Sequence, residues 1–367
     1  MRLARLLLTL GIALTWGMAC ARPSAPTAGQ APAAPGAVSA PSESRAGASP
    51  ASAASPGAPA AAAPALEPVR LGLIAPLSGY WAVYAADALG YFAREGVALD
   101  QMLTGSPSQS AQLLASGDLD LAINTPDTAI IAITKGADFA IVASAQSEAL
   151  FGLIGAPGVQ SFADLRGKGI ALNNSSRDGI AAMTRRTLEA NGLRQDEVDL
   201  VMVGGTPQRY AALKSGVVAG ALLTQPQDIM AMAEGMKRLA LVADVVGEWQ
   251  NLSVIANHGW ARGHDDLLVR WLRGYIAACR WIQDPANRAE AVALLEPVLQ
   301  VSEDIAQRTW SLYFEERAGR AWTEDCGVRP GGLRNVITLN EELGAFDGPA
   351  PAVEQVLDAS FWERARR

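Results

Sequence analysis

The sequence predicts an α/β protein in which mainly parallel sheets carry helices on their faces. Segment 85–124 is the first observation, because it reads as a helix, a strand, a second helix and a second strand. Units of this kind build parallel sheets. The second observation is a pattern that occurs four times along the chain: an apolar segment runs into a polar residue, a proline and a helical pattern.

The elements of segment 85–124 are marked by residues that begin and end helices. Its first helix should end at Gly96, since glycine suits the left-handed conformation that closes many helices. A short strand and a loop follow. Ser106, Pro107 and Gln109 then form a helix start, with serine as the N-cap and proline in the first turn. The second strand is predicted at 119–123.

The four strand-to-helix openings are Ser106-Pro107, Thr125-Pro126, Thr206-Pro207 and Gln225-Pro226. A fifth opening, at 173–176, has capping residues without the proline. In a doubly wound sheet these helix N-termini point at one crevice. Their free N–H groups and helix dipoles suit anions and polar heads. Ordinary helix capping is the alternative interpretation.

The remaining elements follow the same α/β pattern. Strands are predicted at 69–74, 141–143, 150–154, 168–172, 198–203, 239–244 and 253–256, with the strand at 150–154 leaving the first lobe. A helix is predicted at 178–191. Beyond it, apolar residues recur at helical spacing from Leu267 to Ile282, and we expect this tryptophan-containing stripe to pack in a core.

Several ordered motifs resemble one family. GYFAREGV, QLLASGDLDLAIN, ADLRGKGIAL and ALKSGVVAGALL are similar to the ABC-importer solute-binding proteins that handle nitrate, aliphatic sulfonates, taurine and thiamine-pyrimidine precursors, over about residues 68–365. The resemblance implies a two-lobed periplasmic-binding-protein-like fold of type II. Lobe 1 would comprise 66–155 plus 251–367, and lobe 2 would comprise 156–250. It also implies capture of a small-molecule ligand by a monomer and delivery to an ABC permease.

The candidate ligand-binding residues lie in the loops at the predicted crevice. Aromatic residues directly after the first strand suit stacking on a flat ligand, and hydroxyls suit polar contacts. Packing within the lobe is the alternative for Trp81. The position of Trp249 near the cleft comes only from the resemblance. The candidates are Ser78, Tyr80, Trp81, Ser106, Asn124, Thr125, Asn174, Ser175, Thr206, Thr224 and Trp249.

Few charges accompany these residues. Asp127 adds a negative charge at a helix start. Arg177 and Arg209 also lie near helix starts, where we expect solvated surface charges, and pairing with a ligand anion is the alternative. The set favours a small organic solute with a polar or singly anionic head, such as a sulfonate, a pyrimidine-like molecule or an aromatic carboxylate.

Composition excludes other classes. A net charge of −7 argues against nucleic acid as a partner. The chain has two histidines and three cysteines and no CxxC or HExxH spacing, so we expect no metal site, no cofactor and no catalytic residues. About 300 residues follow the front end, enough for two lobes with separate cores. Cys279 and Cys326 would form a disulfide or remain separate buried thiols.

The N-terminal segment reads as an export signal and tether. Arg2, Arg5 and an apolar run precede GMAC, which resembles a lipoprotein cleavage box with Gly17 where leucine is preferred. Residues 1–20 would be the signal, with Cys20 as the lipidated anchor, and ordinary cleavage nearby with an unmodified Cys20 is the alternative. Residues 21–65, nearly all Ala, Pro, Ser and Gly, would be a disordered linker. The protein would therefore be held in the cell envelope, in the periplasm or on the outer face of the cytoplasmic membrane.

Two other functions remain open. The family resemblance extends to pyrimidine-precursor synthases, so an enzyme on the same fold is the alternative. Those synthases carry a cysteine-rich motif that is absent from this sequence. An extracytoplasmic sensor would need a membrane segment downstream, and the apolar runs after residue 256 are interrupted by arginine.

Overall fold

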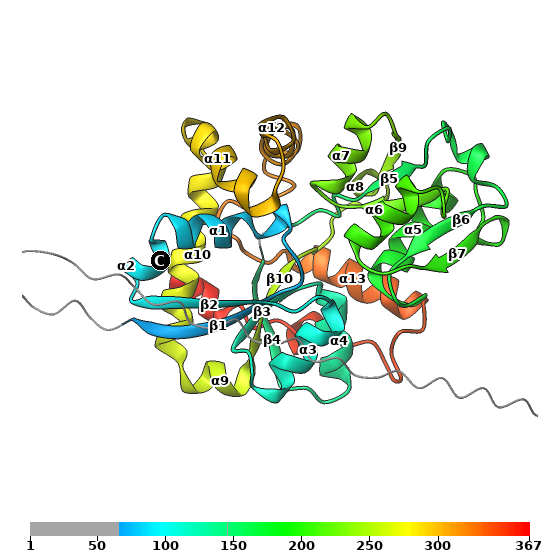
Figure 1. Cartoon of the computed structure of the whole chain (residues 1–367). Helices are drawn as coiled ribbons and strands as arrows, with labels where there is room; N and C mark the ends of the chain where they lie inside the picture. The colour runs from blue at the N-terminus through cyan, green and yellow to red at the C-terminus, as the bar shows by residue number, and fades with distance from the viewer. Residues whose placement is uncertain (1–65, 145) are drawn as a thin grey trace, which may run out of the picture. The chain divides into compact units, whose positions relative to one another are not determined.

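Strands and helices alternate from Glu67 onward in the computed structural model, which describes residues 66–144 and 146–367 (Figure 1). The predicted signal, the Cys20 anchor and the linker at 21–65 lie outside the described residues.

The first sheet takes strands from two distant parts of the chain. Its strand order is β2-β1-β3-β10-β4. β1 runs parallel to β2 and β3, whereas β10 runs antiparallel to β3 and β4. The strands are β1 (Glu67–Leu73), β2 (Val97–Leu103), β3 (Leu121–Asn124), β4 (Phe139–Ser144) and β10 (Ser253–Asn257).

The second sheet repeats this arrangement with the order β7-β6-β8-β5-β9. β6 is parallel to β7 and β8, and β5 is antiparallel to β8 and β9. The strands are β5 (Gly152–Gly155), β6 (Gly169–Leu172), β7 (Asp199–Met202), β8 (Gly220–Leu223) and β9 (Lys237–Leu241). The predicted fold class, two helix-flanked α/β sheets, is confirmed, and each sheet is mixed through one antiparallel strand.

Helices connect the strands and extend beyond them. Those before β10 are α1 (Trp81–Ala88), α2 (Tyr91–Arg94), α3 (Pro107–Ser116), α4 (Pro126–Thr134), α5 (Gly179–Ala190), α6 (Thr206–Lys214), α7 (Gln227–Ala233) and α8 (Ala243–Val246). Those after it are α9 (His258–Gly263), α10 (Asp265–Gln283), α11 (Arg288–Leu299), α12 (Glu303–Ser311), α13 (Pro330–Glu342) and α14 (Ser360–Ala365). We find none, among the described residues, with the length and hydropathy needed to span a bilayer.

The helix-start signals act largely as the sequence predicts. The Ser106 Oγ accepts a hydrogen bond from the Gln109 N–H at 3.2 Å, and α3 ends at Gly117 with φ 79°. Two expectations were wrong in detail. The capping residue of α5 is Asp178, not one of residues 173–176. The strand predicted at 239–244 stops at Leu241, and α8 begins two residues later.

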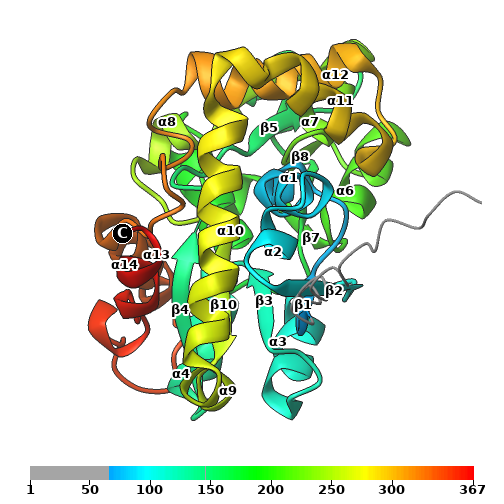
Figure 2. The same cartoon turned by 90° about the vertical axis from the view of Figure 1, so that its left-hand side faces the viewer.

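Two hydrophobic cores hold these layers. In the first, α10 (yellow in Figure 2) lies in front of the first sheet and beside α1 and α2, and its Trp271 and Tyr275 are buried. The expected packing of this tryptophan stripe is confirmed. The second core is continuous between the two sheets. Ile141 and Ile255 of the first sheet belong to the same group of buried side chains as Leu153 and Leu222 of the second sheet.

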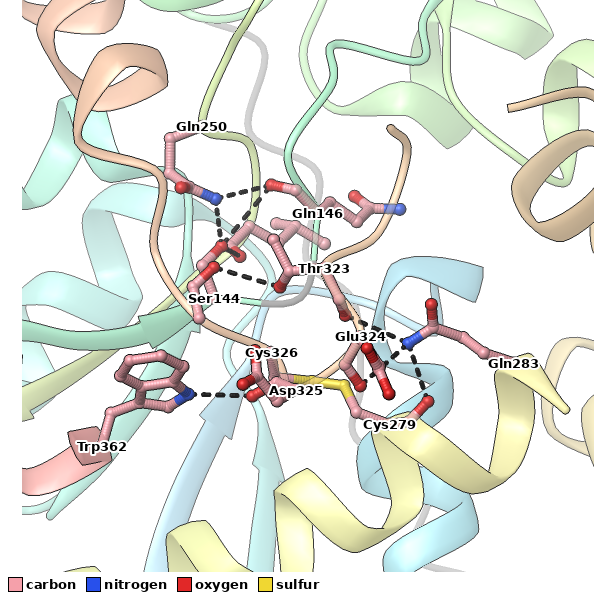
Figure 3. Close-up of a disulfide and its surroundings, with 12 residues drawn as sticks. Ser144, Gln146, Gln250, Cys279, Gln283, Thr323, Glu324, Asp325, Cys326 and Trp362 are labelled. Carbon is pink, nitrogen blue, oxygen red and sulfur yellow. Dashed lines mark hydrogen bonds between the residues drawn. A yellow bond between two sulfur atoms is a disulfide. The ribbon is translucent and has the colours of Figure 1, made fainter. Parts of the chain in front are cut away.

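A disulfide joins α10 to the loop before α13. Cys279 and Cys326 are bonded, with their Cα atoms 6.1 Å apart, so the disulfide alternative is the correct one (Figure 3). Gln283 Nε2 donates to the carbonyls of Thr323 and Glu324 at 3.0 and 3.2 Å. Trp362 Nε1 donates to the Asp325 carbonyl at 2.8 Å. These bonds fix the loop on both sides of the disulfide.

Candidate functional site

A cavity of about 740 Å³, which we call the cleft, lies among loops that follow strands of both sheets. The first sheet contributes the loops after β1, β2 and β3, and the second contributes the loops after β6, β7 and β8. The carboxyl ends of parallel strands are where α/β sheets bind ligands. The cavity therefore lies where the topology predicts a site.

Six of the predicted site residues line this cavity. Two come from loops of the first sheet and four from loops of the second, and they are Ser106, Thr125, Asn174, Ser175, Thr206 and Thr224. Thr125 and Gly205 are the N-caps of α4 and α6, and neither residue caps the backbone N–H groups of its helix with a side chain. These two helix ends therefore keep N–H groups that a ligand can use.

The other five predicted residues do not line the cavity. Trp81 is 0% exposed, and its Nε1 donates to the Ala291 carbonyl at 3.0 Å. Tyr80 donates its hydroxyl hydrogen to the Ile123 carbonyl, and the Asn124 amide donates to the Pro107 carbonyl. Trp249 is buried in the second core. Ligand contact by these residues stays a prediction, and their observed partners are groups of the chain itself.

Ser78, the fifth of them, belongs to a buried network that links the sheets. Its hydroxyl donates to the Gln225 carbonyl at 3.0 Å and lies 2.9 Å from the Tyr313 hydroxyl. Gln225 Nε2 in turn donates to Asp228 at 2.9 Å, and Asp228 pairs with Arg238 at 3.0 Å. Full burial raises the pKa of Asp228 to about 6. The network fixes the start of α7 against the loop after β1.

Two carboxylates meet at the start of α5. Asp178 is the N-cap and accepts from the Ala181 N–H at 2.9 Å. Asp127, which belongs to α4, accepts from the Gly179 N–H at 3.1 Å. Both carboxylates line the cavity. A negative charge is favourable at a helix N-terminus. The start of α5 is therefore already occupied by the chain's own acids, unlike the starts of α4 and α6.

The environment of Asp178 changes its acidity. Burial and the neighbouring Asp127 charge together raise the pKa of Asp178 to about 6, against the opposing effects of the Ala181 N–H and Arg209. The sequence placed the negative charge of Asp127 at a helix start, but it did not show that Asp178 would lie next to that charge. That pairing depends on how α4 and α5 approach each other.

Arg209 corrects an expectation, because it is 1% exposed and not a solvated surface charge. Its guanidinium donates to the carbonyls of Leu222 at 2.9 Å and Gly204 at 2.7 Å, to Thr206 Oγ1 at 3.1 Å, and to Asn173 Oδ1. Burial lowers the pKa of Arg209 to about 10, so it stays charged near neutral pH. Its donors are used to hold the loops after β6 and β7 together.

Arg177 is exposed, as expected, and lies at the cavity wall. The rest of the wall includes apolar side chains that the sequence did not mark. They are Ile74, Ala75, Pro76, Leu77, Leu103, Ile131, Phe151, Ile180, Val203 and Leu252. An apolar wall with a few placed polar groups is typical of sites for small organic molecules. In the described part of the chain, no group of three or more His, Cys, Asp or Glu is placed to hold a metal ion.

The family described as NMT1/THI5 like matches residues 79–288. No curated protein sequence matches the chain.

Solved structures share the fold at low sequence identity. The ligand-binding component of an ABC-type import system from Staphylococcus aureus, with zinc bound, has a TM-score of 0.69 at 14% identity, covering 82% of this chain and 99% of that chain. The periplasmic nitrate-binding protein NrtA from Synechocystis PCC 6803 has a TM-score of 0.68 at 15% identity, covering 83% and 89%. The alkanesulfonate-binding protein SsuA from Xanthomonas axonopodis pv. citri, bound to MOPS, has a TM-score of 0.63 at 17% identity, covering 81% and 99%.

Proposed function

This chain belongs to the NMT1/THI5-like family, and we propose that it is the solute-binding component of an ABC importer. The observation that carries the proposal is the cavity between the two sets of strand ends, to which each sheet contributes helix N-termini. The similar structures include the ligand-binding component of an ABC-type import system, a nitrate-binding protein and an alkanesulfonate-binding protein, and they share this fold.

The proposed ligand is a small organic solute, such as a sulfonate, a pyrimidine-like molecule or an aromatic carboxylate. The volume of about 740 Å³ and the apolar wall suit an organic body. The uncapped starts of α4 and α6 suit a polar or anionic head. Asp127 and Asp178 accept hydrogen bonds, so a donor group on the solute would face them.

Capture would involve movement of two lobes. We take lobe 1 as 66–155 plus 251–367 and lobe 2 as 156–250. The chain passes between the sheets at β4–β5 and at β9–β10, which is the arrangement that hinge closure needs. Asp127 of α4 and Gly179 of α5 would form part of the closed contact. The closed form would be the one presented to the permease.

A thermal screen tests the binding function. Members of the three solute groups are added to purified residues 66–367, and the melting temperature is measured. Native mass spectrometry of the same protein identifies any small molecule that copurifies. A binder at 100 times its dissociation constant stabilises the fold by about 2.7 kcal/mol, a shift of several degrees. Ser108→Trp, at the cavity end of α3, should abolish the shift. Ser116→Trp, at the other end of that helix, is the matched control. No shift with any group, or equal shifts in both variants, would refute cleft binding.

Export and lipid anchoring are further parts of the proposal. The basic and apolar segment before Cys20, and the box GMAC, support processing to a diacylated Cys20. Full-length protein should partition into detergent, and Cys20→Ser should move it to the aqueous phase. Equal partitioning of both would exclude lipidation.

A further inference from the structure

A second cavity, of about 400 Å³, lies between α5 and α13 and carries three arginines. Arg177 precedes α5, and Arg185 and Arg186 lie on it. Arg177 lines both this cavity and the cleft, so the two are adjacent. Glu189 and Glu342 also line the second cavity, which leaves the guanidinium groups in excess of the carboxylates. We call these residues the arginine pocket.

The hydrogen-bonding capacity of the arginine pocket is only partly used. Arg186 Nη2 lies 3.2 Å from Glu342, across α5 and α13. Arg185 Nη1 donates to the Ser176 carbonyl at 2.8 Å, whereas its Nε is shielded from solvent and has no partner. Among the described residues, neither Arg177 nor Arg185 forms an ion pair. A buried donor without a partner costs free energy.

The arrangement is that of an anion site. Burial lowers the pKa of Arg185, although the nearby carboxylates of Asp178 and Glu189 oppose this effect, so the charge of Arg185 is partly desolvated. Guanidinium groups bind phosphate and sulfate oxygens through paired N–H donors. An oxyanion between Arg177 and Arg185 would accept hydrogen bonds from both guanidinium groups. Arg185 also fixes Ser176, next to the cleft residues Asn174 and Ser175.

We propose that the arginine pocket binds a tetrahedral oxyanion, phosphate or sulfate, either free or carried on a solute whose body lies in the cleft. The site is separate from the loops after β1, β2, β3, β7 and β8 that form the rest of the cleft.

Calorimetric titration with inorganic phosphate, at constant ionic strength set with chloride, tests the proposal on residues 66–367. Binding should be saturable at millimolar phosphate, and Arg185→Gln should weaken it at least tenfold. Arg280→Gln, an exposed arginine on α10, makes the same charge change as a control and should bind like the parent. Thermal melts check that both variants fold. Absence of saturable binding, or equal weakening in both variants, would overturn the proposal.

Phenyl phosphate distinguishes the two sources of the oxyanion. If it binds more tightly than inorganic phosphate and Ser108→Trp removes the difference, the oxyanion belongs to a cleft solute. Equal affinities identify a free ion. In either case Arg185→Gln should weaken the binding of both phenyl phosphate and inorganic phosphate. If the substitution leaves their affinities unchanged, the proposed site is wrong.

Discussion

The carboxylate of Asp127 accepts a hydrogen bond at 3.1 Å from the backbone N–H of Gly179, so an acid on α4 caps a helix that follows the second sheet's β6. Asp127 is 7% exposed, and its charge also faces Asp178. The contact therefore couples the two halves of the cleft through one attraction and one repulsion.

Asp127→Ala should loosen this contact. The substitution removes a charged cap, worth about 1 kcal/mol, from the start of α5. It also removes the charge that raises the pKa of Asp178. We expect a larger radius of gyration by small-angle scattering. Thr128→Ala, at the next residue on α4, is the control, since the Thr128 hydroxyl pairs with that of Thr125, the N-cap of the same helix. Unchanged scattering in Asp127→Ala would contradict a role in closure.

Asp178→Asn should change how stability depends on pH. The pKa of Asp178 rises from its ordinary value of 3.8 to about 6 in the folded protein, so the folded state holds the proton more tightly. Its stability contribution is fully present below about pH 4 and is lost as the pH rises through about 6. Asparagine caps equally well and carries no charge.

Urea unfolding at pH 4 and pH 7 measures this effect. The variant should match the parent at pH 4 and exceed it at pH 7 by up to about 3 kcal/mol, reduced by solvent screening because Asp178 is only partly buried. A constant difference between the two proteins at every pH would contradict the raised pKa.

Arg209→Lys should destabilise the second sheet's loops despite keeping the charge. One ammonium cannot replace the guanidinium fork that reaches Leu222, Gly204 and Thr206. Unpaired buried acceptors should lower the free energy of unfolding by about 3 kcal/mol. Arg194→Lys, at an exposed position, should change it little. Similar midpoints for both variants in urea would show that the fork is dispensable.

Replacing both Cys279 and Cys326 by alanine should destabilise the fold. The disulfide closes a segment with a sequence separation of 47. The chain-entropy relation gives a loss of about 4 kcal/mol for a loop of this length. The measurement is urea unfolding of the double variant beside the reduced and oxidised parent. If the reduced parent unfolds at the oxidised midpoint, the disulfide contributes nothing.

Much of the fold could be predicted because its signals are local. Ser106 with Pro107 starts α3, and glycine ends it, whatever the rest of the chain does. The alternation of these signals with apolar strands gave the α/β class. Six cleft residues were also predictable, since the loops that follow parallel strands meet at one edge of a sheet.

The remainder depends on contacts between distant segments. The burial of Trp81 is decided by α11, whose Ala291 carbonyl it meets 210 residues later. Arg209 is buried because the carbonyls of Leu222 in β8 and Gly204 in the loop after β7 accept its hydrogen bonds, and no local pattern in the sequence predicts that. The mixed character of each sheet arises from β5 and β10, short apolar strands whose direction the sequence does not show.

The placement of β10 between β3 and β4 has a consequence for the order in which the chain can fold during synthesis. β3 and β4 have no strand between them until residues 253–257 have left the ribosome, by which time the whole second sheet has been made. β5 to β9 can pair as soon as they emerge. The C-terminal half of the chain therefore completes the N-terminal sheet, and a nascent chain stalled before residue 253 should contain a folded second sheet beside an unfinished first one.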